Sequence, residues 1–234
     1  MQLFYSYEPI GSSCVLDEQE SKHAVRVLRL SAGDHIYLTD GSGTLFKAII
    51  KDPSPRGCVV DICESSPGSD LRPYILNIAI SPLKNPDRFE WFVEKAVEIG
   101  IDLITPVICD RTEKHGIKTT RIEKLITTAM KQSGKTKRTI FGEPIKFCDF
   151  VNTRFEGTRL IAHCNPGTKH TIGELYMRGD SCSILIGPEG DFSVAEVEAA
   201  IASGYNPISL GNSRLRTETA GIAACHSIYF LNLI

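Results

Sequence analysis

The sequence lacks the long apolar runs and the leader segment that membrane and secreted proteins carry. None of its 234 residues lies in a stretch approaching the ~18 consecutive apolar positions of a membrane-spanning helix. The opening residues, MQLFYSYEPIGSSC, contain no basic stretch followed by an apolar segment, which a secretory signal requires. We therefore expect a cytoplasmic protein that has no membrane partner.

Closely spaced metal ligands are also missing. The sequence has eight cysteines and six histidines, but no two cysteines form the C-x-x-C pair that zinc sites use. We expect no metal ion, and we expect the thiols to behave mostly as small buried hydrophobic side chains. The cysteines lie at positions 14, 58, 63, 109, 148, 164, 182 and 225.

Phosphate-binding glycine motifs are absent as well. Neither the dinucleotide fingerprint G-x-G-x-x-G nor the P-loop G-x-x-x-x-G-K-S/T occurs, which argues against an ordinary nucleotide-binding α/β enzyme. The composition is otherwise that of a soluble globular protein, with 42% hydrophobic and 23% charged residues.

Positive charge is concentrated in one segment of a chain whose net charge is −2. Residues 111–138 contain nine Lys and Arg residues against two Glu, so the segment carries a charge of +7. Such a one-signed run suits a phosphate-bearing partner such as RNA. A solvated helix face is the competing interpretation, because most charged runs are of that kind.

Residues 1–70 are predicted to form a small β-rich domain. Residues 35–52 contain two strand-like runs around an Asp-Gly-Ser-Gly turn, which is typical of a β-hairpin. Residues 57–64 add a third strand. A linker rich in Ser, Gly and Pro follows from Ser65 to Pro73.

One helix is expected within this domain, from Asp17 to Leu28. Its spacing places Lys22, Arg26 and Arg29 on one face, and the Ser-Ala-Gly-Asp that follows is expected to end the helix at its glycine. The basic stripe resembles a nucleic-acid contact, with a solvated face as the alternative. The opposite, apolar face consists of Ala24, Val27 and Leu28.

Residues 71–234 alternate between buried-strand runs and helices, which predicts an α/β domain with a parallel sheet. Asn85 is expected to cap the first helix, with Pro86 in its first turn and Gly100 at its end. Its apolar stripe is Phe89, Phe92, Val93, Ala96 and Val97. Strands are expected at 74–80, 103–109, 159–164 and 181–187, and another helix is expected at 121–132.

Two strand-loop-helix units near the carboxyl end have glycine at the turn. After the string GPEG, Ser193 and Glu196 form a capping box, so a helix begins directly behind the loop. In the second unit Gly211 lies at the strand end, and Thr217 is expected to cap a helix from Glu218 onward. Such loops present unpaired backbone N–H groups where α/β proteins bind ligands. Because GPEG carries a carboxylate, a neutral or cationic ligand suits it better than a polyphosphate.

Taken together, GPEG and the later string LGNSRLRTETA resemble the signature of the SPOUT methyltransferases. The resemblance is greatest to the small-subunit ribosomal RNA methyltransferase E family. It covers the whole chain, because HAVRVLRLSAGD, KNPDRFEWFVEKAVEIGIDLITPV and AMKQSGK resemble further segments of that family. The sequence departs from the family at Asp191, where many relatives have glycine, and at Ser213, where others have arginine.

This resemblance implies an N-terminal all-β, PUA-like barrel, a C-terminal α/β domain tied in a deep trefoil knot, and a homodimer. The implied cofactor is S-adenosyl-L-methionine, with its adenine held by backbone groups of the two loops. The implied cofactor-binding residues are Leu185, Ile186, Gly187, Pro188, Glu189, Gly190, Leu210, Gly211, Leu215, Arg216, Thr217 and Ala220.

The implied reaction is methylation of N3 of a uridine in the decoding region of small-subunit (16S) ribosomal RNA, either free or in the assembled subunit. The N3 proton must leave, so a base, or a cation that stabilises the resulting anion, is required. Arg216, Glu218 and Glu189 are the catalytic candidates, although a carboxylate in the first turn of a helix also simply suits the helix dipole. The implied RNA-binding residues are Lys22, His23, Arg26, Arg29, Arg111, Gln132, Ser133 and Lys135.

Two alternatives stay open beside this function. One is a non-catalytic RNA-binding protein with a decayed cofactor site, which is disfavoured because both glycine loops are intact. The other is a SPOUT methyltransferase that acts on a different RNA nucleotide.

Overall fold

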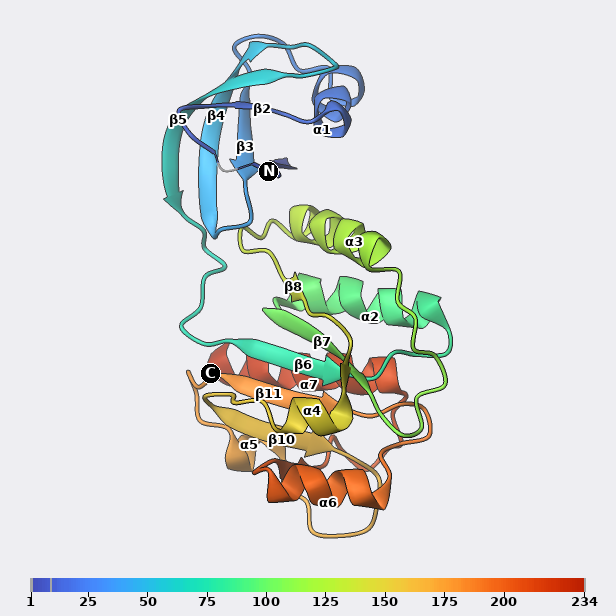
Figure 1. The fold of residues 1–234 in the computed structure, drawn as a ribbon. Helices are drawn as coiled ribbons and strands as arrows, with labels where there is room; N and C mark the ends of the chain where they lie inside the picture. Colours follow the sequence, from blue (N-terminus) through green and yellow to red (C-terminus); the bar gives the residue numbers. More distant parts are fainter. Residues whose placement is uncertain (1, 9, 234) are drawn as a thin grey trace. The chain divides into compact units, whose positions relative to one another are not determined.

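The chain is divided into two compact units, and each is described by itself. The computed structural model describes residues 2–8 and 10–233, so residues 1, 9 and 234 of the predicted domain ranges lie outside it. The first unit contains Met1–Leu71 and Thr127–Arg138, and the second contains Arg72–Ile126 and Thr139–Ile234 (Figure 1). One boundary falls inside the predicted linker, whereas no feature of the sequence predicts that residues 127–138 belong to the first unit.

The first unit is built on a five-stranded sheet with the order β1-β3-β4-β5-β2. β3 and β4 form the predicted hairpin, and β5 pairs with β4 as the predicted third strand. Helical segments accompany the sheet, as the sequence predicts for residues 17–28, so the unit is β-rich rather than all-β. Closure of this sheet into a barrel stays a prediction. The strands are β1 (Leu3–Tyr5), β2 (Ser13–Val15), β3 (His35–Thr39), β4 (Thr44–Asp52) and β5 (Val59–Pro67).

The linker begins later than the predicted Ser65, because strand β5 extends to Pro67. Ser65, Ser66 and Pro67 continue β5 and pair in register with the beginning of β4. The long β4 offers them pairing partners, and this tertiary context outweighs the weak strand propensity of serine and proline. Proline is tolerated there because β5 ends at Pro67.

The predicted basic helix is a short α-helix, α1 (Glu18–Lys22), that continues as a π-helix, η1 (His23–Val27). Its hydrogen bonds reach five residues back, as from Leu28 N to His23 O at 3.0 Å, so side chains no longer follow the α-helical spacing. Ala24 is buried as predicted, but Val27 and Leu28 are exposed by 65% and 37%. The prediction that these two residues face inward was therefore wrong.

The end of this helix also differs from the prediction. Arg29, with φ 57°, adopts the left-handed conformation directly after the helix, so it does not extend the helical stripe of Lys22 and Arg26. Gly33 is also left-handed, with φ 94°, but it lies in a later turn, where its N–H donates to Ile50 O at 2.8 Å.

The part of helix α3 (Thr119–Gln132) from Thr127 onward and the loop after it belong to the first unit, where polar contacts hold them. Lys131 forms an ion pair with Glu20, whose side chain is 6% exposed. Asp70 accepts hydrogen bonds from the N–H groups of Thr136 and Lys137 at 3.0 and 3.1 Å. Burial opposes ionisation of Asp70, but these hydrogen bonds outweigh it and lower its pKa. The carboxylate therefore fixes the returning segment.

The second unit contains a parallel sheet with the order β12-β10-β11-β6-β7-β8, and β9 pairs with the far end of β7. Every strand pair described in this sheet is parallel, which confirms the predicted α/β class. The strands are β6 (Leu76–Ile80), β7 (Leu103–Ile108), β8 (Ile140–Phe141), β9 (Ile145–Lys146), β10 (Thr158–Ala162), β11 (Cys182–Ile186) and β12 (Asn206–Ile208).

Helix α2 (Pro86–Ile99) forms as its sequence predicts. The Asn85 side chain accepts a hydrogen bond from Asp87 N at 2.9 Å, Pro86 opens the first turn, and Gly100 ends the helix with φ 112°. The five predicted stripe residues are all buried, at 4% exposure or less. Local capping and apolar spacing are sufficient to define this helix.

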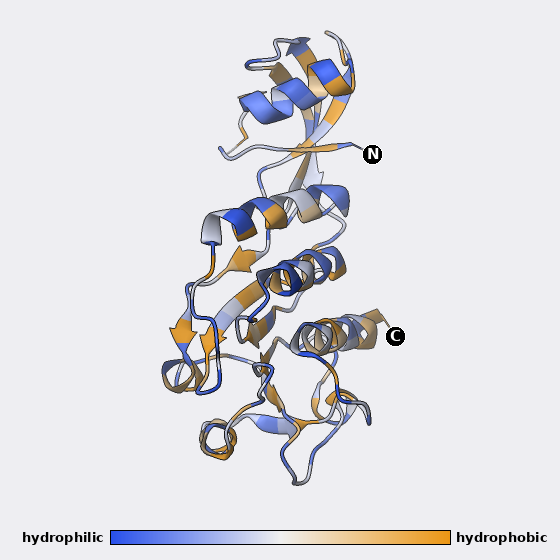
Figure 2. Ribbon diagram, turned by 90° about the vertical axis from the view of Figure 1, so that its right-hand side faces the viewer, coloured by the Kyte–Doolittle hydropathy of each residue, from blue (hydrophilic) through white to orange (hydrophobic). Residues whose placement is uncertain are grey.

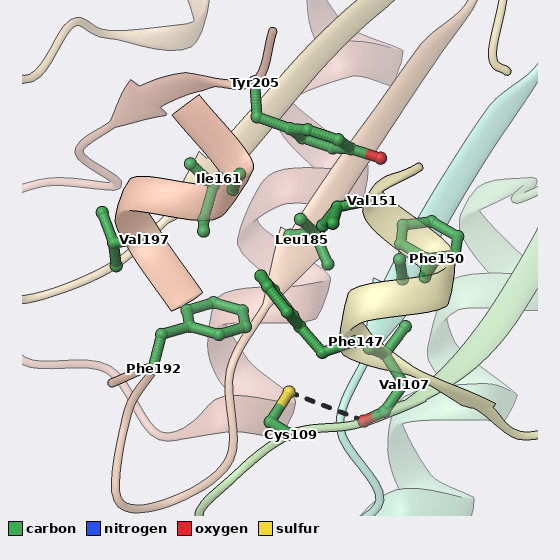
Figure 3. Close-up of a cluster of buried hydrophobic side chains, with 12 residues drawn as sticks. Val107, Cys109, Phe147, Phe150, Val151, Ile161, Leu185, Phe192, Val197 and Tyr205 are labelled. Atoms are coloured by element: carbon green, nitrogen blue, oxygen red, sulfur yellow. Dashed lines mark hydrogen bonds between the residues drawn. The ribbon is translucent and has the colours of Figure 1, made fainter. Parts of the chain in front are cut away.

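Helices cover the parallel sheet on both faces (Figure 1). Alternate strand residues point to opposite faces, so Ala79 and Leu185 pack with α4 (Phe147–Val151) and α6 (Val194–Ala202), as Figure 3 shows for Leu185. Ile80 points instead toward α2 and α7 (Thr217–Leu233). Figure 2 shows mixed hydropathy along the covering helices, as expected for elements with one buried face. The short α5 (Ile172–Leu175) completes the unit.

The cysteines divide into two groups. Cys58, Cys109, Cys182 and Cys225 are buried as expected, but Cys63, Cys148 and Cys164 are exposed, and all are free thiols. Burial raises the pKa of the Cys58, Cys109 and Cys182 thiols, so they stay protonated. The prediction that the thiols are mostly buried holds for only half of them.

Candidate functional site

The two glycine loops leave the same edge of the parallel sheet. Ala162 of β10 is in register with Ile186 of β11 on one side and with Ile208 of β12 on the other. The carboxyl ends of three neighbouring strands are therefore level, and the loops after them emerge together. This edge is where open α/β sheets bind ligands.

The first loop, residues 187–193, follows β11 and is closely packed. A Cβ added to Gly187 would lie 3.1 Å from the Phe192 ring and 3.2 Å from Phe192 N. Glycine is required there for packing of the loop on itself rather than for access of a ligand. Asp191 is left-handed, with φ 63°, and its side chain accepts from Cys164 N at 2.8 Å. The predicted capping box of Ser193 and Glu196 is present.

Polar contacts tie this loop to two neighbouring loops. Glu189 Oε1 accepts from Lys84 N at 3.0 Å, and Arg111 Nη1 donates to Gly190 O at 2.7 Å. The carboxylate of Glu189 thus has a structural partner, and its side chain is on the exposed surface of the loop. These contacts favour a positioning role for Glu189 and Arg111 over direct chemistry.

Leu185 and Ile186 lie before the loop, inside the sheet. Both pair with β10 on one side and with β6 on the other, and Ile186 O also accepts from Ser81 N at 3.0 Å. Sheet pairing therefore occupies backbone groups that the sequence assigned to a ligand. Gly187 to Gly190 supply the backbone groups that lie beyond the sheet edge.

The second loop, residues 209–216, is more open. Gly211 has φ 117°, and a Cβ added to it would meet no atom within 4 Å. The conformation requires glycine, and the space in front of it is clear. Ser209 Oγ holds the turn by accepting from Gly211 N at 3.3 Å. Leu210 and Leu215 are half-buried along the loop.

Helix α7 begins one residue earlier than predicted. Thr217 is its first residue and is 6% exposed, so it does not cap the helix from outside. Arg216 takes the preceding position, where its carbonyl accepts from Ala220 N at 2.8 Å. The guanidinium group of Arg216 is exposed at the start of the helix, and it has no ion-pair partner among residues 2–8 and 10–233.

Glu218 is the most unusual side chain at this edge. It is 7% exposed, its nearest cation is Arg88 at 3.8 Å, and its Oε2 has no hydrogen-bond partner within the described part of the chain. A buried carboxylate oxygen without a partner is costly. Its position in the first turn of α7 offsets part of this cost through the helix dipole. Because this oxygen is buried without a partner, Glu218 is a candidate site residue.

His163 is a site residue that the sequence analysis missed. It follows β10 directly, between the strands that carry the two loops, and both ring nitrogens are buried. Burial lowers the pKa of His163, and Lys169 lowers it further, while Asp191 and the backbone of Asn165 oppose the shift. The imidazole is therefore neutral near pH 7 and can accept a proton. Its position straight after a strand at this edge was the available signal.

The predicted RNA-binding residues are distributed over both units. Lys22 pairs with Glu18 at 2.7 Å, and its hydrogen bond lowers the pKa of Glu18. His23 contacts Gln2 through Nε2 at 3.0 Å, and Ser133 Oγ donates to Ala129 O at 2.7 Å. Exposed side chains in the first unit include those of Arg26, Arg29 and Gln132, while Lys135 is half-buried there and Arg111 is exposed in the second unit.

The residues of this edge fit a ligand that is cationic and free of phosphate. The loops offer backbone groups beyond the ends of the strands, and the space before Gly211 is open. The partner-free oxygen of Glu218 suits a cation or a proton donor. Both properties match S-adenosyl-L-methionine, the cofactor that the sequence resemblance implies, because its sulfur carries a positive charge and it contains no phosphate.

Two family models match the chain. One, described as an RNA methyltransferase domain, matches residues 71–229, and the other, described as an RNA methyltransferase PUA domain, matches residues 16–63. The first covers more than half of the chain. No helix among the described residues is long and apolar enough to cross a membrane.

Similar proteins include both solved structures and curated relatives. A probable rRNA-methyltransferase from Porphyromonas gingivalis is 39% identical with a TM-score of 0.94, covering 100% of this chain and 99% of its own. A ribosomal RNA small subunit methyltransferase E from Neisseria gonorrhoeae, bound to S-adenosyl methionine, is 26% identical with a TM-score of 0.88, covering 99% and 98%. A relative of the same name from Rickettsia conorii is 28% identical, covering 94% of this chain and 91% of its own length.

Proposed function

Because the chain belongs to the RNA methyltransferase family, we propose that it transfers a methyl group from S-adenosyl-L-methionine to N3 of a uridine in small-subunit ribosomal RNA. The observation that carries this proposal is the meeting of two glycine loops and a buried, partner-free carboxylate oxygen at one sheet edge. Similarity to a relative with the cofactor bound supports the choice of methyl donor.

The cofactor is assigned to the backbone of the two loops. Residues 187–190 and 210–216 line it with main-chain groups, and Gly211 leaves the space that a side chain would fill. Leu185 and Ile186 form the apolar floor at the end of β11. Thr217 and Ala220 form the start of the helical wall. When bound, the cofactor supplies an electrophilic methyl group on a positively charged sulfur.

Three side chains are assigned to the substrate. Glu218 and His163 are the candidate acceptors of the uracil N3 proton, because Glu218 Oε2 has no hydrogen-bond partner in the described chain and burial lowers the pKa of the His163 ring. Arg216 stabilises the negative charge that develops on a uracil oxygen, or holds an adjacent phosphate. Holding donor and acceptor in line contributes much of the remaining rate enhancement.

The finer features of the family are part of this proposal. They are a deep trefoil knot in the C-terminal segment, a homodimer, and the decoding region of the small subunit as the target. Exposed apolar side chains on α2 and α7 support the dimer, because such residues mark interfaces when they gather on adjoining helices. They are Trp91, Phe230 and Leu233, exposed by 45%, 50% and 61%.

The basic residues of α1 and η1 are expected to contact RNA phosphates. Replacing Lys22, Arg26 and Arg29 with alanine should weaken RNA binding and lower the slope of log affinity against log salt by about one per lost phosphate contact. Binding titrations over a range of salt concentrations measure this slope. Lys51→Ala removes a surface lysine that pairs with Asp61 in the same unit, and it serves as the control. An unchanged slope in the triple variant would remove this helix from the RNA interface.

Mapping of modified nucleotides tests the proposed function directly. Ribosomal RNA from cells with and without the protein is digested and analysed by mass spectrometry. We expect one N3-methyluridine of the small-subunit RNA to disappear with the protein and to return with the wild-type chain. Restoration by a Glu218→Gln variant would argue for a role other than catalysis, and an unchanged RNA would exclude the proposed function.

A further inference from the structure

A separate pocket lies in the second unit, beside the loops of the candidate site. It has a volume of about 170 Å³ and lies between the start of α2 and the segment before α3. Its lining includes Pro82, Leu83, Phe89, Lys114, Gly116 and Lys118. None of these residues belongs to the two glycine loops.

The lining combines an apolar floor with a basic rim. Leu83, Phe89 and Ile122 are buried, at 4% exposure or less, and proline rings extend the apolar surface. Arg121 neutralises Glu90 through two contacts of 2.7 Å. Lys114 and Lys118 have no ion pair within the described residues, and against the single unpaired carboxylate of the lining, Asp87, they leave an excess of positive charge. An apolar surface beside unpaired cations is the pattern with which proteins hold an unpaired base and its phosphate.

Direct bonds connect the pocket to the candidate site. Pro82 and Leu83 line the pocket, while their neighbours bond to the first loop: Ser81 N donates to Ile186 O, and Lys84 N donates to Glu189. One short segment, residues 81–84, therefore separates the pocket from the cofactor loops. An RNA strand that places its target base at those loops brings a neighbouring nucleotide to the pocket.

The size of the pocket fits a single base. Sites for whole cofactors and drug-sized ligands usually measure roughly 300–1,000 Å³, well above the volume of this pocket. We propose that the pocket holds one unpaired nucleobase of the ribosomal RNA next to the methylated uridine, with Lys114 and Lys118 at the adjoining phosphates. This inference rests on the proposed function and adds a determinant of which nucleotide is selected.

A variant that fills the pocket tests the proposal. Gly116 lines the pocket, its φ is not in the left-handed region, and a Cβ added to it would meet nothing within 4 Å, so Gly116→Phe is tolerated by the free protein. The probe is a small-subunit RNA fragment that the wild-type chain methylates. Its binding to each protein is measured by fluorescence anisotropy. We expect affinity for this fragment to fall by about 5–150-fold, the range measured for loss of a stacked base. Gly173→Phe, in a glycine position with ordinary space around it, is the control.

An abasic scan separates this proposal from its competitors. One abasic position beside the target uridine should make the wild-type affinity match that of Gly116→Phe, while affinity for S-adenosyl-L-methionine stays unchanged in both proteins. Equal RNA affinity of the wild type and Gly116→Phe would overturn the proposal. A shift of Gly116→Phe from dimer to monomer would also overturn it, because a second copy of the chain would then occupy the pocket. If the wild type does not bind S-adenosyl-L-methionine at all, the proposed function itself is refuted.

Discussion

Glu218→Gln is expected to lower the rate of methyl transfer by about 10²–10⁴-fold, the usual contribution of a positioned proton acceptor. The substitution keeps the size of a side chain that is 7% exposed and removes only its charge and basicity. It changes the oxygen that has no partner in the described chain. Single-turnover assays with the RNA substrate measure the rate of the chemical step, separate from binding.

The matched control is Glu196→Gln. Glu196 is equally buried, at 6%, but its oxygens accept from Asp110 N and Ser193 N as part of a capping box. Glutamine also serves in a capping box and keeps one of the two acceptor oxygens, so this variant should lose about 1 kcal/mol of stability with one hydrogen bond and keep near wild-type activity. A rate within a few-fold of wild type for Glu218→Gln would transfer the proton acceptor role to His163, and His163→Gln would then show the loss.

Gly221→Val is expected to lower the free energy of unfolding by about 3 kcal/mol or more, at the upper end of the cost of overpacking a core. A Cβ at Gly221 would lie 2.6 Å from Phe92 Cε2 and 3.1 Å from Ile80 Cδ1. Both neighbours are fully buried, so neither can move aside freely. Because Gly221 is less than one turn from Glu218, the same shift of α7 should also reduce activity. Denaturant titration measures the loss of stability.

Two further variants isolate the cause. Gly173→Val has its nearest neighbour, Leu231 Cδ2, at 3.9 Å and should cost little. Phe92→Leu makes room beside Gly221, so the double variant Gly221→Val and Phe92→Leu should lose less stability than the sum of the single variants. Simple additivity would mean that the contact with Phe92 is not the source of the strain.

Local signals in the sequence were sufficient for much of the second unit. Asn85, Pro86 and Gly100 define α2 because each acts on its own backbone or on the next turn. Ser193 and Glu196 define the start of α6 in the same way. Such signals depend on neighbours in the sequence and need no tertiary information.

The predictions from sequence failed where contacts between residues distant in the sequence determine the structure. The exposure of Val27 and Leu28 follows from a π-helix, which their spacing does not reveal. Asp70 and Thr136 are far apart in the sequence, so their contact, which returns residues 127–138 to the first unit, could not be predicted.

The two glycine loops were predicted from the sequence, but the burial of the side chains around them was not. The glycine strings located both loops, because glycine at a strand end is visible in the sequence. The free oxygen of Glu218 and the neutral imidazole of His163 depend on burial and on the packing of three loops. Spacing along the chain carries no record of either property. The implied catalytic roles of Arg216, Glu218 and Glu189 therefore remain proposals.

Calorimetric titration with S-adenosyl-L-methionine tests the central claim, that the open backbone around Gly211 holds the methyl donor. Gly211→Val and Gly179→Val are compared, because both glycines are left-handed, with φ 117° and 88°, and both have open space before them. Their backbone strain is similar, but only Gly211 lies at the proposed cradle. We predict saturable binding to the wild type and to Gly179→Val, and about tenfold weaker binding or none to Gly211→Val. Equal affinity of all three proteins, or no binding by the wild type, would contradict the account.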